Sequence, residues 1–200
     1  NNQNLIDGLN KLPDNLTLTP VFNKAKNQEL AEGVSREIII KEIQSGRANG
    51  FGLITGNLSG YLLAIDCDGP TAHELAEKLG GLLKTVSWTS GKEGRAQYLY
   101  LVPPEYREAL KNFIGKFWNG NQGEQLELRY NSMQSVLYPS VHPETGGYIS
   151  INSFEDTPIA ESPTWAIEQF WMETGQPTLD FTKTPQQDPI PLIKCLSREH

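Results

Sequence analysis

Cysteine, long apolar stretches and basic charge are all scarce in this sequence of 200 residues. Its two cysteines, Cys67 and Cys195, are too few and too far apart for a disulfide scaffold or a metal-binding cluster, which predicts a reducing, cytoplasmic setting. No apolar run approaches the roughly 20 residues of a membrane-spanning helix, so no membrane partner is expected. Among the three histidines no pair has zinc-ligand spacing, which disfavours zinc hydrolases.

Basic residues number 17 against 24 acidic ones, giving a formal net charge of −7. Proteins that bind DNA tightly by themselves usually carry a basic face, so this charge predicts weak or local binding to any nucleic acid. Hydrophobic residues make up 38% of the chain and charged residues 20%, as in an ordinary soluble domain with a real core.

The order of the expected elements indicates an α/β (α+β) domain with a mainly antiparallel sheet flanked by helices. Residues 13–20 are expected to form a loop. Apolar strands at 51–56 and 61–68 are joined by a Gly, Asn and Ser turn, which predicts a hairpin. Helices are expected at 28–45, 70–83, 104–117 and 162–174, and further strands at 85–89, 95–102, 125–130, 135–139 and 148–151. In the third helix the inward-facing residues would be Leu110, Phe113, Ile114 and Phe117.

The composition changes near residue 176. Residues 1–175 are expected to be one folded domain. The following stretch, QPTLDFTKTPQQDPIP, is rich in Pro and Gln, as linkers are. The residues after this stretch, LIKCLSREH, are expected to be the start of a truncated C-terminal module, so that 176–200 comprises a linker and this start.

Two aspartates end an otherwise apolar strand, in the stretch AIDCD. Residues two apart lie on one face of a strand, with Cα atoms about 6.6 Å apart, so Asp66 and Asp68 can converge on one or two hard cations. Mg²⁺ is typically held by one or two carboxylates together with substrate phosphates. A cap for the turn before Pro70 accounts for the pair about as well. Cys67 is expected to point away from this face and to be buried.

A second acidic strand, QLELRY, favours the metal site. Its apolar residues alternate with Gln125, Glu127 and Arg129, so one face carries a carboxylate and a guanidinium. If this strand lies beside Asp66 and Asp68, Glu127 completes a three-carboxylate site. Arg129 would then lie one pleat away, where it could bind a phosphate through two hydrogen bonds. A solvated face of an amphipathic strand is the alternative.

The loop TSGKEGRAQ separates two further strands. Its small residues would let backbone N–H groups approach an anion, and its side chains add donors and charge. It is not a Walker loop, and a polar hairpin loop is the plainer interpretation. Gln97 begins the next strand and could reach back toward the loop. The candidate residues are Ser90, Gly91, Lys92, Arg95 and Gln97.

These elements, with the segment PSVHPETGGY after them, resemble the N-terminal domain of bifunctional DNA primase/polymerases (Prim-Pol) of the archaeo-eukaryotic primase superfamily. The family pattern has a glycine-bounded strand like GFGLITG, a strand ending in D-x-D, a Ser-Gly loop, a strand with a third acid, and a Pro-Ser-x-His-Pro segment. The resemblance covers roughly 12–154. Two departures stand out, because Gln97 replaces the family's usual His and Glu127 replaces its frequent Asp.

The resemblance implies a two-lobed catalytic domain over 1–175 with an RRM-like sheet, acting as a nucleotidyltransferase in DNA priming. Asp66, Asp68 and Glu127 would bind two Mg²⁺ or Mn²⁺ ions. The implied nucleotide-binding residues are Ser90, Gly91, Lys92, Arg95, Gln97, Arg129 and His142. Single-stranded DNA template, primer and NTP or dNTP would be the partners, with a fused or associated helicase or C-terminal primase module.

Two other functions fit the same residues. A metal-dependent nuclease would use the clustered carboxylates equally well. A non-catalytic module that binds nucleotide or DNA would agree with the acidic net charge and with Gln97, which cannot carry a positive charge.

Overall fold

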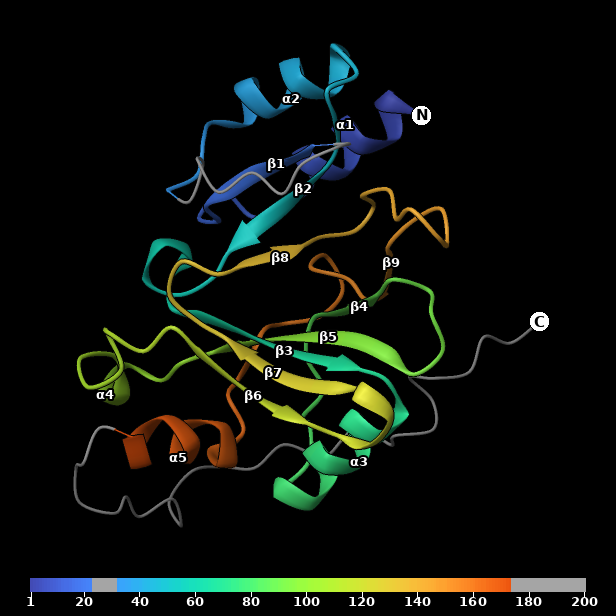
Figure 1. Ribbon diagram of the computed structural model, residues 1–200. Coiled ribbons are helices and arrows are strands. Elements are labelled where there is room, and N and C mark those ends of the chain that lie inside the picture. The colour runs from blue at the N-terminus through green and yellow to red at the C-terminus, as the bar shows by residue number, and fades with distance from the viewer. Residues whose placement is uncertain (23–31, 174–200) are drawn as a thin grey trace.

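The computed structural model describes residues 1–22 and 32–173, which form a mixed α/β fold of two mainly antiparallel sheets (Figure 1). This is the expected fold class. The helix expected at 28–45 begins in the described part at Arg36, and the expected linker at 176–200 lies outside the described residues. In the described ranges no helix is long and apolar enough to span a membrane.

The smaller lobe contains a three-stranded sheet in the order β1-β2-β8, covered by two helices (Figure 1). Ser35 begins the second of these helices by accepting a hydrogen bond from the N–H of Ile38. The side chains of Leu9, Ile39 and Phe51 fill the space between helices and sheet. The elements are α1 (Asn2–Asn10), β1 (Leu18–Phe22), α2 (Arg36–Gln44), β2 (Ala48–Ile54) and β8 (Gln134–Val136).

β1 corrects the loop expected at 13–20, because its first three residues belong to that segment. Pro20 argued for a loop, since it lacks the N–H that a central strand needs. β1 is an edge strand of its sheet: it pairs with β2, and on its other side an isolated bridge joins Leu18 to Val34. Such an edge position tolerates proline.

The larger sheet has seven strands, of which six follow the order β6-β7-β3-β5-β4-β9, while β10 pairs with β5 in parallel. Three helices accompany it. Its strands are β3 (Leu62–Asp68), β4 (Ser87–Thr89), β5 (Arg95–Leu101), β6 (Gly115–Asn119), β7 (Gln125–Arg129), β9 (Ile149–Asn152) and β10 (Ala160–Glu161). The helices are α3 (Pro70–Leu79), α4 (Pro104–Arg107) and α5 (Thr164–Glu173).

The expected hairpin of 51–56 and 61–68 is wrong, because β2 and β3 belong to different sheets. Only an isolated bridge joins Gly56 to Leu62. Gly56 has φ 91°, and a Cβ there would lie 2.4 Å from the backbone of Asn131. Glycine therefore allows the chain to leave the small sheet and enter the large one at this point.

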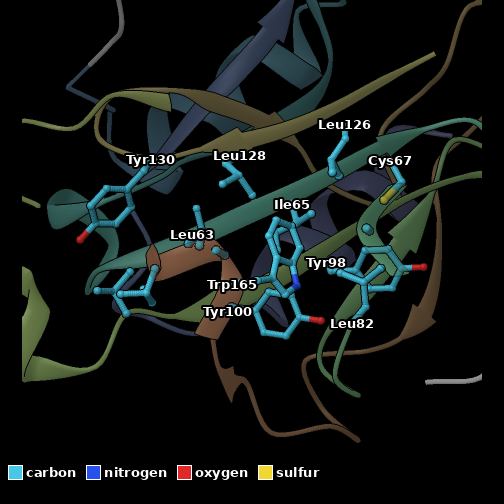
Figure 2. Packing of buried hydrophobic residues seen from close by; sticks show 14 of the residues in the cluster. Leu63, Ile65, Cys67, Leu82, Tyr98, Tyr100, Leu126, Leu128, Tyr130 and Trp165 are labelled. Carbon is cyan, nitrogen blue, oxygen red and sulfur yellow. The ribbon is translucent and has the colours of Figure 1, made fainter. Parts of the chain in front are cut away.

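Each face of β3 packs against a different core. Leu63, Ile65 and Cys67 lie on the face that α3 and α5 cover, where Trp165 also packs (Figure 2). Leu62 and Ala64 lie on the opposite face and pack against the smaller lobe. Cys67 is fully buried, as expected. The alternation of strand side chains thus places Asp66 and Asp68 on the face shared with the smaller lobe.

The helix expected at 104–117 is also wrong. α4 ends at Arg107, and Gly115–Asn119 is the edge strand β6, paired over five residues with β7. Leu110 is buried as expected, but Ile114 and Phe117 are 65% and 57% exposed. Side chains of this segment alternate between the two faces of the sheet, because the segment pairs with β7. The helical spacing of its apolar residues therefore did not identify a buried helix face.

Candidate active site

The central feature of the site is a row of side chains across the large sheet. In the register of β3 and β7, Asp66 lies directly opposite Glu127. On the other side of β3, Asp66 faces Gln97 of β5 and Asp68 faces Arg95. The two acidic strands are neighbours, as a three-carboxylate site requires.

Arg129 joins two of the carboxylates. Its Nη2 donates to Asp66 Oδ2 at 2.9 Å, and its Nε donates to Glu127 Oε1 at 2.6 Å. The three side chains are only 19–20% exposed. Strong charge-assisted hydrogen bonds in a partly buried setting hold both carboxylates in place. The guanidinium was expected on a phosphate, but in this structure it binds the acids.

Asp66 has a perturbed acidity. Burial raises the pKa of Asp66 to about 6, against the opposing attraction of Arg129. The charges of Asp68 and Glu127 raise it further. A carboxyl group kept from water among other acids is costly to ionise, and such groups cluster at functional sites.

The side of the site toward β5 and β4 is cationic. Arg95 Nε lies 3.1 Å from Asp68 Oδ1. Lys92 forms an ion pair with Glu144, an exposed residue of the later segment 139–148. Both cations are about one-third exposed, so they remain accessible to an anion.

Two backbone N–H groups of the loop at 90–94 donate hydrogen bonds to nearby side-chain hydroxyl groups. The N–H of Gly91 donates to Thr89 Oγ1 at 3.0 Å, and the N–H of Lys92 donates to Ser90 Oγ at 3.4 Å. Ser90 is buried, and its carbonyl accepts a hydrogen bond from Thr145 Oγ1. Because these two N–H groups already have partners, the loop would attract an anion mainly through the positive charges of Lys92 and Arg95.

The segment 139–148 places His142 beside this loop. Its Nδ1 accepts hydrogen bonds from the N–H groups of Glu144 and Thr145, at 3.2 and 3.3 Å. Burial, followed by the charge of Lys92, lowers the pKa of His142. In the neutral ring the proton must then lie on Nε2, which is a donor suited to a phosphate oxygen.

Tyr148 belongs to the site but was not singled out from the sequence. Its ring packs edge-on against His142 with centroids 5.4 Å apart. Burial and the nearby charge of Asp66 raise the pKa of its hydroxyl. The only signal in the sequence was its place at the end of PSVHPETGGY.

Gln97 is the other unusual group. Its Oε1 is buried without a hydrogen-bond partner, one of two such side-chain atoms in the described ranges. The residue lies opposite Asp66, so an unpaired acceptor stands beside the carboxylates. Buried acceptors rarely remain unpaired, and this one suits a bound donor or cation.

Within residues 1–22 and 32–173 no group of three or more His, Cys, Asp or Glu side chains is gathered as a metal site. The contacts of Arg129 with Asp66 and Glu127 occupy oxygen atoms that a cation would use. The donor set itself consists of hard oxygen ligands of the kind that Mg²⁺ and Mn²⁺ take. The expected metal site therefore stays a prediction.

Three further large side chains near the sheet are buried. Trp88 and Trp165 are buried core residues. His73 of α3 is also buried, and its Nε2 lies 2.9 Å from the Tyr98 hydroxyl. His73 therefore serves the packing of α3 on the sheet.

A comparison with protein families adds to this geometry. The family model described as "Bifunctional DNA primase/polymerase, N-terminal" (Prim-Pol) matches residues 18–165. This range covers most of the chain and every residue placed in the site. No curated protein matches the chain significantly.

Proposed function

The chain belongs to the bifunctional DNA primase/polymerase family, which gives it a function of the primase or polymerase type, and we propose that it joins nucleotides from NTP or dNTP on a single-stranded DNA template. The observation that carries the proposal is the facing pair Asp66 and Glu127, with Asp68 on the same strand face. This acidic row borders the cations Arg95 and Lys92, as a reaction between a hydroxyl and a triphosphate requires.

The carboxylates of Asp66, Asp68 and Glu127 would hold two Mg²⁺ or Mn²⁺ ions. When bound, such ions lower the pKa of an attacking 3′-hydroxyl and neutralise the charge of the leaving pyrophosphate. The unpaired Oε1 of Gln97 supports the fit, because it adds another oxygen beside Asp66.

The chain's own residues would bind and orient the reactants. Lys92 and Arg95 bind phosphate oxygens and offset their charge. His142 donates from Nε2 to the same group, because its Nδ1 is fixed by the turn at Glu144 and Thr145. Arg129 positions Asp66 and Glu127 through its two hydrogen bonds.

The proposed binding partners follow from membership of the primase/polymerase family. Template, primer and nucleotide are the direct partners. A helicase or a C-terminal primase module, fused or associated, would supply DNA strands to a domain that is itself acidic. A cytoplasmic location remains the expectation from cysteine content.

The test is synthesis from labelled nucleotides on single-stranded DNA, with and without a primer, in Mg²⁺ or Mn²⁺. We expect product from the unmodified chain and none from a D66A/D68A double variant that melts cooperatively. Asp14→Asn, which changes an exposed acid between α1 and β1, is the matched control and should retain activity. Synthesis by the double variant would contradict the proposal.

Two other outcomes would assign the rival functions. Metal-dependent cleavage of the template without nucleotide consumption would indicate a nuclease. Thermal stabilisation by nucleotide, with no product under either metal, would indicate a non-catalytic binding module.

A further inference from the structure

We propose that the exposed ring of Phe117 is a stacking platform for a nucleobase of the strand whose 3′-hydroxyl is extended. This inference rests on the proposed function and deepens it by assigning a primer-binding residue. Its basis is the position of β6 at the open edge of the large sheet, next to β7 (Figure 1).

The register of the sheet aligns Phe117 with the acidic row. Phe117 lies opposite Glu127, and Glu127 lies opposite Asp66. Residues directly opposite one another in a sheet share a face, so the ring is on the face that carries the carboxylates. Two strand spacings, or about 10 Å, separate the backbones of Phe117 and Asp66. That distance is within the reach of one or two nucleotides.

The ring is unusual in being exposed. Phe117 is 57% exposed, whereas large aromatic residues such as Trp88, Tyr98 and Tyr100 are buried in the two cores. Among the described residues with large exposed hydrophobic side chains, Phe117 is the aromatic one; the others are Ile38, Leu58, Ile114, Val141 and Ile149. An aromatic face beside a reactive site can stack on any base.

The distribution of charge selects the strand that would stack. Lys92 and Arg95 lie on the β4–β5 side of the carboxylates, where a triphosphate would bind. Phe117 lies on the opposite side, beyond β7. The reactive hydroxyl must approach from the side away from the leaving pyrophosphate, so the base next to Phe117 belongs to the primer end.

Stacking also suits the net charge of −7. Contacts with phosphates weaken as a protein becomes acidic, whereas stacking uses the uncharged face of a base. An aromatic platform therefore lets an acidic domain hold a strand at its site without a broad basic surface.

The test compares Phe117→Ala, Phe117→Leu and Phe117→Trp in primer extension. We expect the KM for primed template to rise about tenfold in the Ala and Leu variants, in line with the loss of one stacked base. The Trp variant should retain the KM of the unmodified chain, and the KM for nucleotide should change less than twofold in all three. Ile114→Ala is the matched control, because Ile114 is 65% exposed and precedes the same strand.

A second readout separates this inference from the proposed function. Fluorescence anisotropy of a labelled single-stranded oligonucleotide, without nucleotide or metal, should show weaker binding for Phe117→Ala and unchanged binding for Phe117→Trp. If the unmodified chain makes no product, this binding difference still supports the platform while the function fails. Extension by the unmodified chain with an unchanged primer KM in Phe117→Ala and Phe117→Leu overturns the platform and leaves the function intact.

Discussion

Replacing Asp66 by Asn is expected to stabilise the fold at alkaline pH while it removes activity. The pKa of Asp66 is about 6 in the folded chain, against an ordinary value of 3.8. The folded state therefore holds the proton more tightly than the unfolded chain. The contribution of protonated Asp66 to the unfolding free energy is fully present below pH 3.8 and is lost as the pH rises through 6.

The size of the effect follows from the two values. Each pKa unit corresponds to about 1.4 kcal/mol, so ionised Asp66 costs about 3 kcal/mol of unfolding free energy at pH 8. By the same linkage the cost is about 1.6 kcal/mol at pH 5, where the folded-state carboxyl is mostly protonated. Asn carries no charge, so Asp66→Asn should gain most of this free energy at pH 8 and about half as much at pH 5.

Urea unfolding in EDTA at pH 5 and pH 8 measures the difference. Asp14→Asn is the control, because Asp14 is an exposed acid outside the site and its replacement should change the unfolding free energy by less than about 0.5 kcal/mol at either pH. A gain that is equal at the two pH values, or a loss at pH 8, would refute the reasoning that burial of the charge controls the acidity of Asp66.

Two further predictions concern the groups around Asp66. Arg129→Met leaves two acids facing each other with no guanidinium, and should lower the unfolding free energy by about 3 kcal/mol at pH 8 in urea. Adding Glu127→Gln should recover part of that loss, and no recovery would argue against charge as its cause. His142→Asn keeps an acceptor for the turn at 144–145 but lacks Nε2, so the KM for nucleotide should rise, while the lost ring contact with Tyr148 should lower the melting temperature by only a few degrees. An unchanged KM would exclude His142 from nucleotide binding.

Much of the fold was predictable because strand and helix patterns are local. The strands that carry Asp66, Arg95 and Glu127 were all expected near their observed positions. The errors fell where a distant segment decided the local structure. β6 is a strand because β7 pairs with it, and β1 accommodates Pro20 because β1 lies at the edge of its sheet.

The sequence by itself determined the two faces of the acidic strands, since alternation of side chains is a property of any extended chain. It placed Asp66 and Asp68 on one face and Cys67 on the other. Only the tertiary structure decided which strands are neighbours, because pairing between segments far apart in the chain depends on how whole surfaces pack. That pairing brought Glu127 and Gln97 to either side of Asp66, joined Arg129 to both acids, and left Phe117 exposed at the edge of the same face.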